Sequence, residues 1–149
     1  MPSFTKGGGQ RTPFGSNEYL RSTRDCKFES YTVAAATVPT ETIDGVTQKV
    51  LKPGEVMAKI TSGGDAGKVG PFMAGATDGR QTLANIVGLN DTWLPWQLME
   101  RDAEVSVCYE ATAIQAWCFE RDSGGARIAL TNTTAAAMVA QKSMGLQFK

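Results

Sequence analysis

The chain has 149 residues, and its fifteen basic and fifteen acidic residues cancel to a net charge of zero. A chain of this length folds most economically as one domain, and a neutral balance argues against a protein that mainly coats nucleic acid or an anionic membrane. Histidine is absent, which removes the usual general base at neutral pH and the commonest zinc ligand. Catalysis would therefore depend on carboxylates, lysine or an unassisted cysteine.

Targeting and redox signals are also missing from the sequence. No apolar run approaches the roughly 20 residues that span a bilayer, and the first six residues lead into glycines rather than a signal-peptide core. We therefore expect a protein of the cytoplasm with no membrane partner. The three cysteines are an odd number without C-x-x-C spacing, so we expect small buried side chains rather than a disulfide framework or a zinc site. They are Cys26, Cys108 and Cys118.

Residues 1–30 differ in composition from the rest of the chain. Five basic residues face three acidic ones, glycine and serine are frequent, and the apolar residues are isolated. Such a segment buries too little to fold alone, so we predict an extended arm that becomes ordered on a partner. The alternative is that the arm pairs as an extra strand with its own domain or with a neighbouring subunit. The candidate partner-binding residues are Phe4, Arg11, Phe14, Tyr19, Leu20, Arg21 and Arg24.

The sequence pattern of residues 31–149 is typical of a β domain. Pro53-Gly54 suits the central positions of a type II turn. After it, Val56, Ala58 and Ile60 alternate with Met57, Lys59 and Thr61, which is the period-2 pattern of a half-buried strand.

The following run Gly63-Gly64-Asp65-Ala66-Gly67-Lys68 suggests either a phosphate-binding loop or a turn. A phosphate-binding loop needs an earlier glycine where Ser62 stands, a hydroxyl where Val69 stands, and then a helix. Gly70-Pro71 cannot begin an ordinary helix. We therefore predict two extended segments joined by a turn, and no nucleotide cofactor.

The middle of the chain continues with turns and apolar strands. Residues 76–79, Ala-Thr-Asp-Gly, form a turn signal before residues 83–89, which are apolar enough for a strand buried on both faces. Residues 91–101 follow no periodicity that predicts an element. Within them, Trp93-Leu94-Pro95-Trp96 is notable because proline between two tryptophans resists a central strand. Trp93, Leu94 and Trp96 are predicted either to form a protein interface or to cover the open end of a barrel.

Three acidic residues follow at alternate positions, namely Glu100, Asp102 and Glu104. Carboxylates on one side of a strand can bind a hard cation, but the glycine and ligand spacing of a calcium loop is missing. We favour a solvated strand face and predict no metal site. Cys108 and Cys118 lie on apolar strand patterns with no histidine to activate them, so we predict core packing rather than catalysis.

The remaining elements are two strands, one helix and a short terminal strand. Val105, Val107 and Tyr109 alternate with Ser106, Cys108 and Glu110. Residues 113–120 are predicted to form a further strand with Trp117 and Phe119 on one face. Asn132 is predicted to cap a helix over Thr133–Met144 that ends at Gly145 in a left-handed conformation. Its buried face would contain Ala135, Met138, Val139 and Lys142. This alanine-rich helix is too short to span a membrane, and residues 146–148 are predicted to form a terminal strand.

Many short strands separated by glycine turns, with a single helix, predict a mainly β fold, a small barrel or sandwich. The order of these elements resembles the lambda-like head decoration proteins of tailed bacteriophages. The resemblance is carried by LKPGEVMAKI, then GKVGPFMAGATDGRQTLANIVGL, then EVSVCYEATAIQAWCF and the closing helix. It covers about residues 46–149 and depends on turn chemistry in a characteristic order.

The resemblance implies a non-enzymatic structural protein of the virion. Such a protein binds the outside of the expanded capsid as a homotrimer at threefold and quasi-threefold positions, with the major capsid protein as its partner, and resists internal DNA pressure. It implies no direct nucleic-acid binding and a decoration domain at residues 31–149. Two alternatives remain open, a tail-tube or other virion component and a small enzyme that uses Glu100, Asp102 and Glu104.

Overall fold

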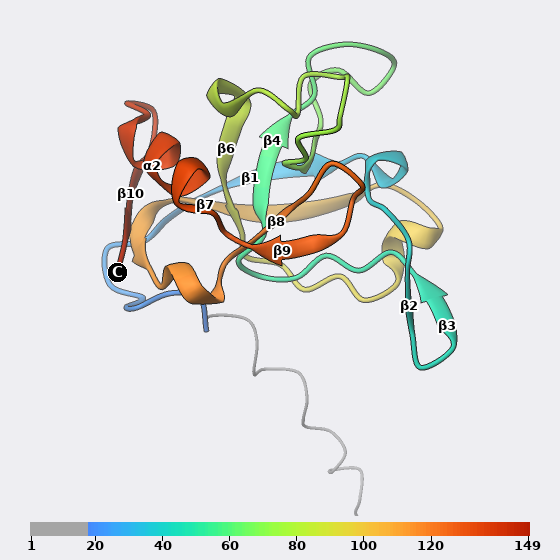
Figure 1. Ribbon diagram of the computed structural model, residues 1–149, viewed down its shortest axis with the longest axis horizontal. Helices are drawn as coiled ribbons and strands as arrows, with labels where there is room; N and C mark the ends of the chain where they lie inside the picture. The colour runs from blue at the N-terminus through green and yellow to red at the C-terminus, as the bar shows by residue number, and fades with distance from the viewer. Residues whose placement is uncertain (1–17) are drawn as a thin grey trace, which may run out of the picture.

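The structure is a computed structural model that describes residues 18–149, and it is mainly β (Figure 1). The ten strands are β1 (Lys27–Val33), β2 (Glu41–Ile43), β3 (Val46–Gln48), β4 (Val56–Lys59), β5 (Val69–Pro71), β6 (Ile86–Asn90), β7 (Ala103–Ala113), β8 (Phe119–Arg121), β9 (Arg127–Ala129) and β10 (Gly145–Phe148). Four 3-10 turns are η2 (Ala35–Thr37), η3 (Leu83–Asn85), η4 (Gln97–Met99) and η5 (Gln115–Trp117), and the one described α-helix is α2 (Asn132–Ala140). The mainly β prediction with a C-terminal helix is confirmed.

The main sheet closes on itself. Its strand order is β1-β5-β4-β6-β7-β10, and β1 also pairs with β7, so β1, β5, β4, β6 and β7 form a ring from which β10 branches. Closure leaves few strand edges open to other chains. Two further hairpins, β2–β3 and β8–β9, stand outside this ring.

The long strand β7 organises the ring. It pairs antiparallel with all of β1, antiparallel with the end of β6, and parallel with β10. Gly88 on β6 allows the close approach of β6 to β7, because its φ is +147° and an added Cβ would collide with the carbonyl oxygen of Cys108. Only glycine adopts such a backbone readily.

Side chains from opposite faces of the sheet form two cores, because successive residues on a strand point to opposite faces. One core draws on β1, β4, β5 and β7 and consists of Val33, Val38, Leu51, Met57, Val69, Leu94, Leu98, Val105 and Val107. The other core lies beneath α2 and β10 and includes Val56, Ala58, Ile86, Leu89, Cys108, Met138 and Leu146. Met57 therefore belongs to one core while its neighbours Val56 and Ala58 belong to the other.

The glycine-rich run after β4 is a turn, as predicted. β4 and β5 pair antiparallel with Lys59 opposite Val69, and the chain reverses between them with Gly63 and Gly67 at positive φ. A helix does not follow this run. Lys68, its last residue, forms ion pairs with Asp65 at 2.8 Å and with Asp102 at 2.6 Å.

The C-terminal helix is shorter than predicted. It ends at Ala140 rather than Met144, and its N-cap is Thr131 rather than Asn132. The Thr131 hydroxyl accepts a hydrogen bond from the Thr134 amide and donates one to the buried carboxylate of Glu120. Gly145 does not end the helix but begins β10, and Val139 is exposed. The terminal strand itself is confirmed.

Two strand predictions were partly wrong. Residues 113–120 do not form one strand, because β7 ends at Ala113 and η5 intervenes before β8, which leaves Trp117 half exposed. Likewise residues 83–85 form η3, and the strand begins only at Ile86. Local apolar pattern does not distinguish a 3-10 turn from a strand at this length.

The predicted arm boundary at residue 30 was also wrong. Residues 27–33 form β1, and Leu20 pairs antiparallel with Ala113. Tyr19 and Leu20 are buried in the core beneath α2. Residues 18–30 therefore belong to the folded domain. For β1 this agrees with the alternative that the arm pairs as an extra strand with its own domain.

Candidate interaction surface

The segment between β6 and β7 is held to the domain by backbone pairing. The amides of Leu51 and Leu94 each donate to the other's carbonyl oxygen at 3.0 Å. This pair attaches the Trp93–Trp96 stretch to the chain that leads from β3 to β4.

The buried side chain of Asn90 fixes the start of the same segment. Its Nδ2 donates to the carbonyl oxygens of Lys52 at 2.9 Å and Thr92 at 2.7 Å, and its Oδ1 accepts from the Thr92 amide at 3.1 Å. The Thr92 hydroxyl in turn accepts from the Ser106 amide at 2.9 Å. A loop with its polar groups paired in this way is rigid compared with an unpaired loop.

Two leucines in this segment point inward, which turns three large apolar side chains outward. Leu94 and Leu98 are buried in the core around Met57, whereas Trp93, Trp96 and Met99 are 42%, 47% and 47% exposed. We call these three exposed side chains the Trp surface. The prediction that Leu94 faces a partner was wrong, because it anchors the loop in the core. Of the two alternatives for the tryptophans, the side chains of Trp93 and Trp96 have the exposure that an interface requires.

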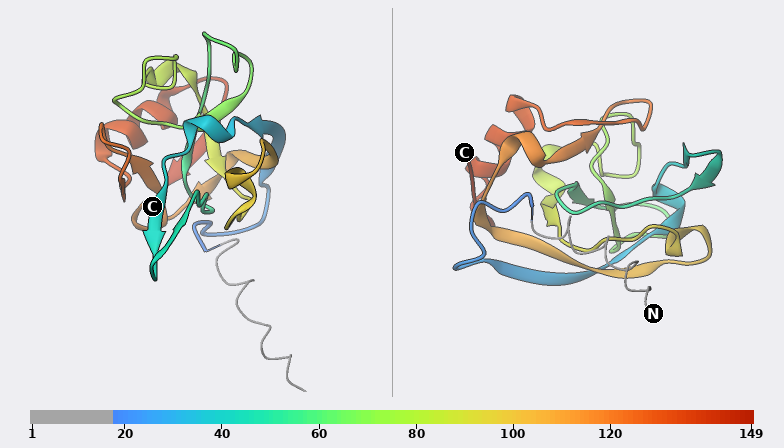
Figure 2. Two further views of the ribbon diagram at one scale, coloured as in Figure 1. Left: turned by 90° about the vertical axis from the view of Figure 1, so that its right-hand side faces the viewer. Right: turned by 90° about the horizontal axis from the view of Figure 1, so that it is seen from below.

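The β2–β3 hairpin presents a second apolar feature at the same end of the molecule. Ile43 and Val46 are paired across the hairpin and exposed, and Asp44 and Gly45 form its turn with positive φ values of 50° and 80°. Two consecutive positive φ values are typical of a tight hairpin turn. Figures 1 and 2 place the hairpin and η4 at the end away from α2 and the C-terminus.

A buried ion-pair network holds the base of this hairpin. Glu41, at the start of β2, accepts two hydrogen bonds from Arg127, at 3.0 and 2.9 Å. The fully buried Glu55 accepts from Arg127 at 2.8 Å and from Arg121 at 3.1 Å. The guanidinium of Arg121 also donates to the carbonyl oxygens of Gly125 and Val50. Buried charges require such partners, since removing one partner leaves an uncompensated charge.

The network favours the charged form of Glu41. Burial acts to raise the pKa of this carboxyl, but the hydrogen bonds and charge of Arg127 and the charge of Arg121 outweigh burial and lower it. For Arg127, burial acts to lower the pKa, while Glu41 and Glu55 raise it. A two-stranded hairpin is marginal by itself, so this charged clamp stabilises its position against the domain.

The three carboxylates considered as a cation site each interact with a different residue of the chain. Glu100 lies beside Arg101 at 3.6 Å, Asp102 bonds to Lys68 and to the Ala35 amide, and Glu104 accepts from the Thr32 hydroxyl. The hydrogen bond from Lys68 is the main cause of a lowered pKa at Asp102. Only Glu104 lies within β7, so the three do not share a strand face. Within residues 18–149, no cluster of three or more histidine, cysteine or acidic residues is placed to hold a metal ion.

The cysteines differ in burial. Cys108 and Cys118 are fully buried, as predicted, and burial raises the pKa of each thiol to about 12. Cys26 is only half-buried, and burial raises its pKa as well. A nucleophilic cysteine needs a lowered pKa, so the environment of these thiols opposes that role.

The predicted arm residues are divided by the structure. Phe4, Arg11 and Phe14 lie outside the described residues. Arg21 and Arg24 are exposed and available to a partner. The proposed partner contact of Tyr19 and Leu20 was wrong, because both side chains are buried.

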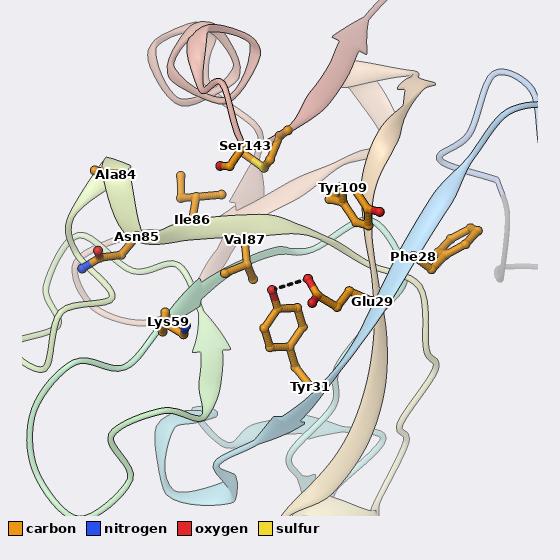
Figure 3. A pocket seen from close by; sticks show the side chains of 11 residues that line it. Phe28, Glu29, Tyr31, Lys59, Ala84, Asn85, Ile86, Val87, Tyr109 and Ser143 are labelled. Carbon is orange, nitrogen blue, oxygen red and sulfur yellow. Dashed lines mark hydrogen bonds between the residues drawn. The ribbon is translucent and has the colours of Figure 1, made fainter.

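Sequence reasoning missed a cavity beside β1 and β6. It has a volume of about 550 Å³ and is lined by Phe28, Glu29, Tyr31, Lys59, Ala84, Asn85, Ile86, Val87, Tyr109, Ser143 and Met144. Figure 3 shows Glu29 and Tyr31 of β1 reaching toward Val87 of β6. The Tyr31 hydroxyl donates to the Glu29 carboxylate at 2.9 Å. The period-2 spacing of Glu29 and Tyr31 with the core residue Val33 was the available signal, but the predicted arm boundary at residue 30 separated Glu29 from the other two.

Comparison with protein-family models, with curated proteins and with solved structures finds no match to this chain. Among the helices of residues 18–149, none combines the length and apolar character that crossing a membrane requires.

Proposed function

We propose that the protein is a non-enzymatic structural protein that binds the outer surface of the expanded capsid of a tailed bacteriophage. It binds as a homotrimer at threefold and quasi-threefold positions and stabilises the head against internal DNA pressure. Its partners are the major capsid protein and two further copies of itself, and its location is the virion, after assembly in the host cytoplasm.

The observation that carries the proposal is the Trp surface and the way it is held. Trp93, Trp96 and Met99 are exposed on a segment anchored by two buried leucines and by the paired Asn90. Tryptophan is enriched at the centres of protein interfaces, and a segment whose backbone is already fixed loses little backbone entropy when it binds. A rigid apolar surface on a small β barrel is suited to binding a fixed partner.

The hairpin extends this apolar end. Ile43 and Val46 are exposed on a two-stranded element that projects from the barrel (Figure 1). We assign the Trp surface to contact with the capsid protein and the hairpin to contact with a neighbouring copy. Many identical contacts repeated over a shell give a large collective stabilisation even where each contact is modest.

The proposal is tested by mixing the purified protein with expanded empty capsids assembled from the major capsid protein of the same phage. We expect saturable cosedimentation and, in cryo-electron images, threefold knobs on the outer surface. Failure to bind capsids would contradict the proposal. Assembly of the protein alone into stacked rings or tubes would instead favour the tail-tube alternative.

A further inference from the structure

Among residues 18–149, one strand of the closed barrel has an edge without a strand partner. In the described part of the chain, residues 27–32 of β1 pair only with β7, and β5 pairs with β1 only where Val33 meets Val69. The open edge and the 550 Å³ cavity share the same residues, since Phe28, Glu29 and Tyr31 line the cavity. Open strand edges invite a further strand.

The pairing register of β1 with β7 shows in which direction the backbone groups of Ser30 point. Ser30 lies opposite Ser106. Both backbone groups of Ser106 point away from β1, because its amide donates to the Thr92 hydroxyl and its carbonyl oxygen accepts from the Asp91 amide. Ser30 and Ser106 are therefore a pair without mutual hydrogen bonds. The N–H and C=O groups of Ser30 consequently point to the edge opposite β7.

The cavity beside this edge combines aromatic walls with a carboxylate. Tyr31, Tyr109 and Val87 contribute aromatic and aliphatic surface, and Glu29 is bonded to the Tyr31 hydroxyl. In the described part of the chain Glu29 forms no ion pair; Lys59 on the opposite wall lies beyond ion-pair distance of it. A strand with a large apolar side chain could fill the cavity, and a basic residue two positions later could pair with the Glu29 carboxylate.

We propose that residues 3–6 of the same chain bind here as an additional strand along β1, with Phe4 in the cavity and Lys6 beside Glu29. This strand would donate to and accept from the free backbone groups of Ser30. Phe4 and Lys6 are two positions apart and so face the same side of an extended segment.

Three features of the sequence select this segment. Ser3-Phe4-Thr5-Lys6 is the one part of residues 1–17 with alternating character and neither glycine nor proline, and residues 1–17 carry only basic charges. Leu20 pairs with Ala113, four residues from Tyr109 on β7, a distance of about 13 Å along a strand. The intervening residues 7–18 extend to roughly 40 Å, so the segment reaches the cavity of its own chain.

Amide hydrogen exchange of the full chain, followed by NMR, tests this inference without any capsid. We expect the Ser30 amide to exchange roughly tenfold or more slowly in the full chain than in a variant lacking residues 2–6. The Tyr31 amide, which faces β7, and the Ala58 amide on β4 serve as internal references and should not change. Equal Ser30 exchange in the two proteins would overturn the inference.

Two substitutions and a dilution series sharpen the test. Phe4→Ala should lose the protection of Ser30, and the matched variant Phe14→Ala should keep it. Circular dichroism of both variants establishes that the described domain keeps its fold. Protection that is unchanged on dilution supports binding within one chain, whereas protection that falls on dilution would show that the strand comes from a second copy and would overturn the inference. Because capsids are absent, these outcomes are independent of the proposed capsid binding.

Discussion

At the scale of single residues, the hydrogen bond between Tyr19 and Asp91 fixes the point where the described chain enters the domain. The Tyr19 hydroxyl donates to the Asp91 carboxylate at 2.6 Å. Burial is the largest cause of a raised pKa at Tyr19, and the Asp91 hydrogen bond raises it further, so the phenol remains a donor. The pKa of Asp91 is raised as well, chiefly by burial. The Tyr19 hydroxyl and the Asp91 carboxyl group therefore serve as hydrogen-bond partners for each other in a partly buried site.

Replacing Tyr19 with Phe removes the donor but keeps the ring. We expect a loss of about 1–3 kcal/mol in the free energy of unfolding, because the Asp91 carboxylate is left without its partner. Urea denaturation at neutral pH measures this loss. Tyr31→Phe is the matched control, since it removes an exposed hydroxyl bonded to Glu29. A Tyr19→Phe protein as stable as the control would contradict this role.

The clamp at Glu41 predicts a dependence of stability on pH. The folded pKa of Glu41 is lowered, so its stabilising contribution is fully present above the unfolded pKa and disappears as pH falls through the folded pKa. Glu41→Gln should therefore lower the free energy of unfolding by about 1–3 kcal/mol at pH 7 and by much less near pH 3. The comparison requires urea denaturation of both proteins at both pH values. A difference independent of pH would contradict the charged clamp.

Gly88 provides a prediction about backbone approach. Gly88→Ala should destabilise the protein by roughly 2 kcal/mol or more. Alanine is strained at a φ of +147°, and its methyl group would collide with the Cys108 carbonyl oxygen. Gly64→Ala is a suitable control, since nothing lies within 4 Å of a Cβ there. Thermal melts compare the two variants, and equal melting temperatures would contradict the close packing of β6 on β7.

At the scale of elements, turn chemistry and alternation were good guides, while element ends were not. Pro53-Gly54, the glycine run before Val69 and the terminal strand were predicted correctly because local residues decide them. The N-cap prediction was wrong because Thr131 is secured by Glu120, a contact made across eleven positions that local pattern does not reveal. The arm boundary was wrong because polar residues 27–32 become a strand only through pairing with distant β7.

Two truncations test this revised boundary. A protein lacking residues 2–17 keeps every described element, so its melting temperature should fall much less than that of a longer truncation. Removing residues 2–25 also removes the buried Tyr19 and Leu20, and we expect a loss of roughly 4 kcal/mol or more in the free energy of unfolding. Calorimetry and urea denaturation provide the measurements. Equal stability of the two truncated proteins would restore residues 18–25 to a dispensable arm.

At the scale of the whole molecule, the closed ring depends on pairings that link distant parts of the chain, such as β1 with β7. Composition and turn spacing predicted a small barrel or sandwich, but no local signal gives the strand order. The Trp93–Trp96 stretch was identified as a candidate interface from the sequence alone. Which of its side chains face outward could not be predicted, because this depends on the pairing of Leu94 with Leu51 and on the burial of Leu98. The exposed apolar hairpin at the same end was not anticipated.

Trp117 offers a matched comparison for the Trp surface. It is as exposed as Trp93 and Trp96, but it belongs to η5, which is joined to α2 by the hydrogen bond from Gln115 to Asn132. It therefore belongs to a different element from the Trp surface. Replacing it changes exposed aromatic area without changing any of the three side chains of the Trp surface.

Capsid recognition through the Trp surface is tested most directly by quantitative cosedimentation with expanded empty capsids at matched salt. The proteins compared are the wild type, Trp93→Ala/Trp96→Ala and Trp117→Ala. Circular dichroism first establishes that all three proteins have the same fold. We predict that the double variant loses about 2 kcal/mol or more of binding free energy, roughly a thirtyfold increase in Kd, while Trp117→Ala binds like the wild type. Wild-type binding by the double variant, or an equal loss in Trp117→Ala, would contradict capsid recognition through the Trp surface.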